Sequence, residues 1–332
     1  MNLFKRSIFF GLSFLFLSFN SHADVKTDIK VVTTIKPLYS LISRIMETRG
    51  EPQLIIEGTN NPHTFVFKPS HAKMIEEADI IFWIGEDLEA FMEKPLDSLA
   101  EKAQVISFME LSSIEKLKFR EKNIFDDHDG HEDEHEGHED DDDDHGHKDD
   151  DHDDDHKDAH AHAHGEFDPH IWLDPENAKE MVKIIRDELI KIDPEGQRQY
   201  SVNTAGATLE LDNLINSVEK ELSKDISYIV FHDAYQYFEN RFGVIPAGAL
   251  TLNPDVLPGA KQIADIQDVI NDKGIKCIFS EPQYNPKIIE TLGNDMNVST
   301  GVIDPLGAFI DAGPTMYVEL INGIANSIKE CH

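Results

Sequence analysis

The stretch GQRQYSVNTAGATLELDNLINSVEKELS, residues 196–223, decides the fold. Apolar residues recur along it at helical spacing, which predicts a single helix with these positions on one face: Val202, Ala205, Leu209, Leu214, Val218 and Leu222. At 1.5 Å per residue such a helix spans about 40 Å, which is longer than one small sheet needs. We therefore expect one long helix that joins two lobes.

On both sides of this helix, short apolar runs typical of buried strands alternate with helical patterns. The expected strands are residues 29–35, 53–58, 79–85, 104–108, 226–232, 244–250, 276–280 and 299–304. The other expected helices are residues 37–45, 69–78, 87–99, 174–192, 260–273, 286–294 and 315–329. Such alternation is typical of parallel sheets covered by helices. The predicted fold class is α/β, with two lobes that each hold a mostly parallel four-stranded sheet flanked by helices.

The predicted domains follow from this pattern. Residues 24–195 form an N-terminal lobe, 196–223 the linking helix and 224–332 a C-terminal lobe. The cleft between two such lobes, at the carboxyl ends of their strands, is the expected ligand site.

An insert rich in aspartate, glutamate and histidine, residues 126–166, interrupts the first lobe. It holds 21 acidic residues, two lysines and eleven of the 17 histidines, and so contributes −19 to the formal net charge of −34. A segment that is almost entirely charged and polar cannot enter a core, so we expect it to be disordered. The acidity of the chain also argues against nucleic acid as a partner, because like charges repel.

The N-terminus has the features of a secretory signal peptide, residues 1–23. Lys5 and Arg6 precede an apolar run, residues 7–19, and Ser21-His22-Ala23 is an acceptable cleavage site. The alternative is a membrane anchor, for which the apolar run is short. No cysteine follows the run, which excludes a lipid anchor there. We expect the mature protein to be exported and soluble.

The chain has two cysteines, Cys277 and Cys331. In an oxidising compartment such a pair favours a disulfide, which would join the last helix to a strand of the second sheet. Two free thiols are the alternative.

Four candidate metal ligands lie in loops or at strand ends. His63 follows the second expected strand, His232 ends a strand, Asp304 ends the last strand, and His170 stands in the motif DPHIWLDP. Each is weak evidence by itself, but three imidazoles with a carboxylate or water form a set suited to zinc. His71 lies on an expected helix and is not expected to be a ligand.

Over its whole mature length the chain resembles the periplasmic zinc-binding components of high-affinity zinc ABC importers. The resemblance rests on the His/Asp-rich insert and on NPHTFVFKPS (61–70), ADIIFWIGEDLEAFMEKPL (78–96), DPHIWLDP (168–175), VFHDAYQYF (230–238), FSEPQYNP (279–286) and IDPLG (303–307). It implies the two-lobed fold, Zn2+ as the cargo, a membrane permease as the partner and a monomeric receptor that is not an enzyme.

The resemblance also implies which residues bind the metal. The family histidines that match His63, His170 and His232 bind zinc, and the fourth position, occupied by water or a carboxylate, matches Asp304. Some members have a metal-reaching glutamate before the first histidine, where this chain has Pro62. That possible ligand is absent here.

Three alternatives stay open. A manganese receptor of the same superfamily would tend to have a carboxylate in place of His232, and oxygen ligands suit manganese better than imidazoles do. A zinc hydrolase would need a general base, for which Asp233 and Glu281 are the only candidates near the ligands. In a periplasmic zinc buffer or chaperone, the insert would be the functional part and the folded body a carrier.

Overall fold

The computed structural model describes residues 29–125, 165–254 and 256–331. The predicted signal peptide lies outside these residues. So does the predicted insert, apart from Gly165 and Glu166.

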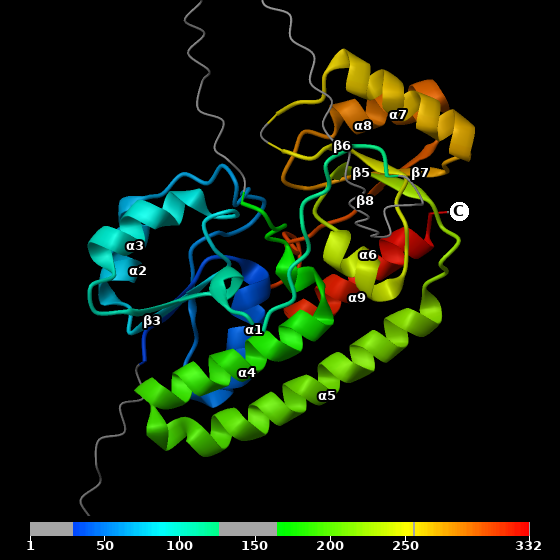
Figure 1. Cartoon of the computed structure of the whole chain (residues 1–332). Helices are drawn as coiled ribbons and strands as arrows, with labels where there is room; N and C mark the ends of the chain where they lie inside the picture. Colours follow the sequence, from blue (N-terminus) through cyan, green and yellow to red (C-terminus); the bar gives the residue numbers. More distant parts are fainter. Residues whose placement is uncertain (1–28, 126–164, 255, 332) are drawn as a thin grey trace, which may run out of the picture.

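Two four-stranded sheets, all of whose neighbouring strands are parallel, form the two lobes (Figure 1). The first has the order β2-β1-β3-β4 and the second the order β6-β5-β7-β8, so both lobes repeat one topology. The strands of the first sheet are β1 (Val31–Thr33), β2 (Gln53–Leu54), β3 (Ile80–Trp83) and β4 (Gln104–Ser107). Those of the second are β5 (Tyr228–His232), β6 (Gly248–Thr251), β7 (Cys277–Ser280) and β8 (Ser299–Val302). The predicted fold class is confirmed.

Most strands are shorter than the apolar runs that predicted them, because the runs continue into buried loops. The run 53–58 is the clearest case. Regular pairing ends at Leu54, yet Ile55 and Ile56 are buried, and their N–H groups donate to the carbonyls of Thr33 and Thr34 at 3.0 and 2.9 Å. The apolar run therefore indicates which residues are buried, but it is longer than the strand itself.

The helices cover the sheets and link the lobes. They are α1 (Lys36–Met46), α2 (Pro69–Glu77), α3 (Glu93–Leu99), α4 (Pro175–Ile192), α5 (Gln197–Glu221), α6 (Gln236–Phe242), α7 (Ala260–Lys273), α8 (Lys287–Met296) and α9 (Met316–Lys329). Helix α6 was not predicted from the sequence. The helix predicted over 87–99 reduces to a 3₁₀ turn, Ala90–Met92, followed by α3. Pro95 lacks an N–H group, so it fits only near the start of a helix, and α3 begins two residues before it.

The predicted linking helix is α5, which has 25 residues and runs beneath both lobes beside α4 (Figure 1). One detail of the prediction was wrong, because Ala205 is exposed and Val202 and Leu209 are each 62% exposed. The residues of α5 that face the core recur at the helical spacing of 3.6 residues: Tyr200, Asn203, Thr204, Ala207, Leu211, Leu214, Ile215 and Val218. Val202, Ala205 and Leu209 lie on the opposite face of the helix.

One hydrophobic core extends from Ile29 in the first lobe to Cys331 at the end of the second. Helix α9 packs against both α1 and α5, so the C-terminal helix closes on the N-terminal lobe. Two hydrogen bonds of Tyr317 stabilise this packing. Its N–H donates to Ser40 Oγ at 2.9 Å, and its hydroxyl donates to the carbonyl of Trp172 at 2.6 Å. The lobes are therefore joined by packing as well as by α5.

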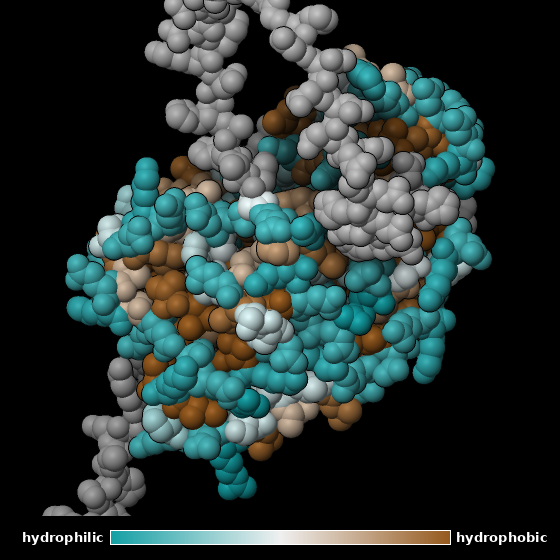
Figure 2. All heavy atoms as spheres, in the orientation of Figure 1, coloured by the Kyte–Doolittle hydropathy of each residue, from teal (hydrophilic) through white to brown (hydrophobic). Residues whose placement is uncertain are grey.

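Polar side chains cover most of the face shown in Figure 2, with apolar residues in separate patches between them. Among the described helices, none combines the length and the apolar character needed to cross a membrane.

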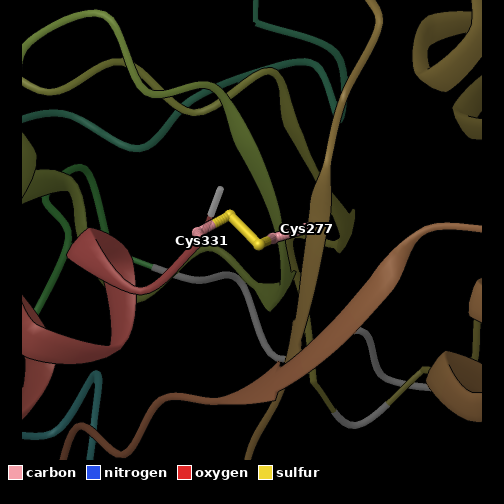
Figure 3. Close-up of a disulfide and its surroundings, with 2 residues drawn as sticks. All are labelled: Cys277 and Cys331. Atoms are coloured by element: carbon pink, nitrogen blue, oxygen red, sulfur yellow. A yellow bond between two sulfur atoms is a disulfide. The ribbon is translucent and has the colours of Figure 1, made fainter.

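A disulfide joins Cys277 in β7 to Cys331, just beyond α9, as the sequence predicted (Figure 3). Both residues are 4% exposed, and their Cα atoms lie 5.5 Å apart. The bond attaches the end of the chain to the central part of the second sheet.

Reduction of this disulfide should lower the melting temperature. The bond closes a loop with a sequence separation of 54, which corresponds to about 4 kcal/mol in the chain-entropy model. For a chain of this size that is a shift of roughly 10 °C in thermal melts followed by circular dichroism. The control is the double variant Cys277→Ser/Cys331→Ser, whose melting temperature should not respond to reductant. An equal melting temperature for the native protein with and without reductant would contradict a stabilising bond.

Candidate metal centre

Three histidines from separate parts of the chain meet between the lobes. His63 lies in the loop after β2, His232 is the last residue of β5, and His170 directly precedes a 3₁₀ helix, Ile171–Leu173, that leads into α4. One ring nitrogen from each lies within 4.8 Å of the others. Within the ranges that the structure describes, this is the only group of histidine, cysteine, aspartate and glutamate with metal-ligand spacing.

The distance between two of these nitrogens fits a tetrahedral zinc ion. The Nε2 atoms of His170 and His232 are 3.4 Å apart. Ligands at about 2.05 Å from a tetrahedral Zn2+ are separated by about 3.4 Å, as the geometry of such a site requires. The ring centroid of His63 lies 5.5 Å from that of His170 and 6.0 Å from that of His232. The three rings therefore surround one point.

Two buried carboxylates fix the orientation of two of the rings. His170 Nδ1 lies 2.7 Å from Asp168 Oδ1, and His232 Nδ1 lies 2.7 Å from Glu281 Oε1. Each carboxylate can accept a hydrogen bond from the Nδ1 atom beside it, and this contact turns the Nε2 atom of the same ring toward the cavity. The Nε2 atoms of His170 and His232 thus face each other at 3.4 Å, where a shared hydrogen or a cation can lie between them.

Burial and charge shift the pKa values of these groups. Burial lowers the pKa of His170 well below its ordinary value, and the nearby His232 lowers it further. Burial raises the pKa of Asp168 to about 7. Burial also lowers the pKa of His232, but the carboxylates of Glu281, Asp233 and Asp168 outweigh it, so the net shift is upward. His170 is therefore neutral at physiological pH, as a metal ligand must be.

The turn that carries His170 is held by four hydrogen bonds. The N–H of His170 donates to Asp168 Oδ1 at 2.9 Å, and the N–H of Asp168 donates to the carbonyl of Leu117 at 2.8 Å. The hydroxyl of Tyr237 donates to the carbonyl of Asp168 at 2.7 Å, and Trp172 Nε1 donates to the carbonyl of Pro305 at 2.8 Å. The motif DPHIW therefore supplies a ligand, its orienting carboxylate and a bond to the other lobe.

The cavity beside the histidines has a volume of about 10 Å³, which is the space of a single ion or water molecule. It is lined by Asn61, Pro62, His63, His170, Trp172, His232, Glu281, Gln283, Tyr284, Pro305 and Leu306. Both lobes contribute to this wall, as expected for a site in the cleft.

Asp304 lies close to the site but outside the histidine group. Its Oδ1 accepts hydrogen bonds from Gln283 Nε2 at 2.9 Å and from the N–H of Leu306 at 3.0 Å. Its Oδ2 accepts one from the N–H of Ala308 at 2.5 Å. In this arrangement the carboxylate stabilises its own loop, and binding a metal would require it to exchange these bonds. Its role as the fourth ligand stays a prediction.

His71 is not part of the group, as expected from its place on α2. Its ring lies against Phe65 and Phe67, and its Nδ1 accepts a hydrogen bond from the N–H of Lys68 at 3.2 Å. This bond caps the start of α2.

Asp168 and Glu281 are the functional residues that the sequence did not reveal as such. Both lie inside motifs noted above, and Glu281 was considered only as a catalytic base. A signal was present for Asp168, because an aspartate two residues before a ligand histidine can reach its ring. Glu281 lies 49 residues from His232, so only the neighbouring positions of β5 and β7 bring the two together.

The sequence profile of a family described as "Zinc-uptake complex component A periplasmic" (ZnuA) matches residues 31–331. The chain belongs to the ZnuA family. It is 47% identical over 303 residues to the "High-affinity zinc uptake system protein ZnuA" of Brucella abortus (strain 2308), covering 91% of each chain. It is 32% identical to the protein of the same name from Yersinia pestis, over 91% of this chain and 90% of that one.

Solved structures support the ZnuA fold. A structure described as a zinc-bound deletion mutant of ZnuA has a TM-score of 0.69 with this chain at 21% identity, and covers 92% of this chain and 98% of its own. A second ZnuA crystal structure has a TM-score of 0.70 at 20% identity, with 92% of this chain and 99% of its own covered. Both confirm the arrangement of two lobes.

Substitution of the orienting carboxylates should weaken metal binding. Asp168→Asn and Glu281→Gln each remove a charge that fixes a ring and its tautomer, and such partners contribute about 10- to 100-fold in metal affinity. Competition of each purified variant with a chromogenic zinc chelator measures the change. Asp187→Asn, on the exposed side of α4, is the matched control and should bind zinc as the native protein does. Native affinity in a folded Asp168→Asn variant would show that Asp168 does not orient His170.

Proposed function

We propose that this protein is a periplasmic receptor that captures Zn2+ in the cleft between its lobes and delivers it to the permease of an ABC transporter. The observation that carries the proposal is the convergence of His63, His170 and His232 on one ion-sized cavity. Membership of the ZnuA family supports zinc as the cargo and the permease as the partner.

The donor atoms favour zinc over manganese. Three imidazole nitrogens are the proposed ligands, with Asp304 as the predicted fourth, and imidazole suits zinc while oxygen ligands suit manganese. The nearest carboxylates to the rings, Asp168 and Glu281, are hydrogen-bonded to Nδ1 atoms. They therefore increase the basicity of the imidazoles.

The arrangement favours binding without catalysis. Both general bases considered for a hydrolase are already engaged. Glu281 holds His232, and Asp233 Oδ1 accepts a hydrogen bond from Arg120 Nη1 at 2.6 Å. A cavity of about 10 Å³ also leaves no space for an organic substrate beside the ion. We infer a receptor and not an enzyme.

The proposal includes the maturation and organisation of the chain. We propose that residues 1–23 are removed on export and that the protein acts as a monomer. The lobes are proposed as residues 24–195 and 224–332, with residues 196–223 as the link. The proposed role of the acidic, histidine-rich residues 126–166 is to collect zinc through many weak ligands and a negative field.

Removal of single ligands tests the site. His63→Ala, His170→Ala and His232→Ala should each weaken tight zinc binding by about tenfold or more, since one of three imidazoles is lost. Each is best made in a variant in which a short flexible linker replaces residues 126–164, so that the insert cannot mask the loss. His71→Ala is the matched control and should keep tight binding, because His71 caps α2 instead. Unchanged affinity after His232→Ala in that background would contradict the proposed site.

The same linker variant separates a receptor from a zinc buffer. A preformed cleft has its ligands ordered by folding, whereas a segment without a core must order its ligands for each ion. Calorimetric titration of the linker variant should therefore show one tight site and the loss of weaker ones. Loss of tight binding, with tight binding retained by a peptide of residues 126–166, would favour the buffer.

A further inference from the structure

Lys36 forms an unusual contact between the lobes. It is the first residue of α1, three positions after the end of β1 in the N-terminal sheet, and it is 8% exposed. Its Nζ donates hydrogen bonds to the carbonyls of Gly307, Ala308 and Ile310, at 2.7, 2.9 and 3.0 Å. An ammonium group has three hydrogens, so every donor of this buried lysine is used by one loop of the other lobe.

That loop, residues 303–310, forms part of the wall of the metal cavity. Pro305 and Leu306 line the cavity, and Asp304 holds the loop from inside through the N–H groups of Leu306 and Ala308. Gly307 has a φ of +63°, and a Cβ atom there would lie 2.2 Å from Met316 Cε. The loop therefore has one tight conformation that depends on its hydrogen bonds.

Three side chains hold the loop from outside. Trp172 Nε1 donates to the carbonyl of Pro305 at 2.8 Å, and the hydroxyl of Tyr235 donates to the carbonyl of Ile303 at 3.3 Å. Both of these residues follow ligand histidines closely, at 170 and 232. Lys36 is the third. It lies on α1, which follows the first strand of the N-terminal sheet, so it connects that part of the N-terminal lobe to the wall of the site.

We propose that Lys36 is a positioning residue that helps the site to retain its metal, an inference that rests on the proposed zinc site. By tying the N-terminal lobe to residues 303–310, it keeps the cavity wall and the Asp304 carboxylate in place beside the three histidines. Lys36 is not among the residues that line the metal cavity, so it acts through the loop. A wall that moves more freely lets the ion and its ligands separate more easily, so loss of Lys36 should speed zinc release.

The test uses the full-length mature protein loaded with less than one equivalent of Zn2+, so that the tightest site is filled first. Excess chromogenic chelator then measures the rate of zinc dissociation. Lys36→Met keeps the apolar stem and removes the three hydrogen bonds, and should raise the rate by about tenfold, the scale of even one hydrogen bond to a charged group. Arg44→Met is the matched control. Arg44 lies on the same helix and binds Glu210 of α5, away from the site, so its loss should leave the rate unchanged.

A double-mutant cycle separates positioning from general destabilisation. Lys36 and Asp304 hold the same loop, so the effects of Lys36→Met and Asp304→Asn on the dissociation rate should combine to less than their product. A fall in melting temperature without faster zinc release, or two effects that multiply fully, would overturn the proposal. His232→Ala shows whether a negative result concerns Lys36 or the zinc site itself. If His232→Ala speeds release while Lys36→Met does not, the proposed zinc site is supported and the proposed role of Lys36 is wrong. If His232→Ala also has no effect, the proposed site itself is wrong.

Discussion

The hydrogen bonds between buried carboxylates and ligand histidines are the interaction on which the site depends. Asp168 and Glu281 each lie 2.7 Å from the Nδ1 of a histidine, and this leaves the Nε2 atoms of His170 and His232 facing each other at 3.4 Å. The protein therefore folds with these two ring nitrogens already at the spacing that a tetrahedral zinc ion requires. In the proposed receptor, this preorganisation contributes to zinc affinity together with the identity of the ligands.

Preorganisation requires that the lobes keep a fixed relative position, since His63 and His232 come from different lobes. A shared core, the long helix α5 and the return of α9 onto α1 provide this constraint. The disulfide fixes the end of α9 to the second sheet, and the buried ammonium of Lys36 crosses the cleft to the wall of the cavity. These contacts favour small relative movements of the lobes over a wide hinge opening.

The sequence predicted the fold class, the long helix, the disulfide pair and the three histidines that meet. Strand–helix alternation is a local feature, and so is a histidine that follows or ends a strand, as at His63 and His232. His170 was indicated by its motif DPHIWLDP, and the disulfide by the presence of two cysteines in a chain expected to be exported. It placed Val202 and Leu209 on the wrong face of α5, since the face of a long helix is chosen by the partners that pack against it. It also missed the pairing of Glu281 with His232. That pair depends on the sheet order, in which β7 lies next to β5. The order of strands cannot be inferred from the pattern of a single sequence. The loop position of Asp304 and its bonds to Gln283, Leu306 and Ala308 likewise arise from tertiary contacts.

The central claim is that three imidazoles of the folded body, and not the acidic insert, hold the tightly bound ion. A crystal structure of the full-length mature protein with one equivalent of Zn2+, with the metal located from anomalous scattering at its absorption edge, tests this directly. The account predicts one strong peak at about 2.0–2.1 Å from a ring nitrogen of each of His63, His170 and His232. Asp168 and Glu281 should remain bonded to Nδ1. A peak elsewhere, or a metal bound directly by Asp168 or Glu281 with the rings displaced, would contradict it.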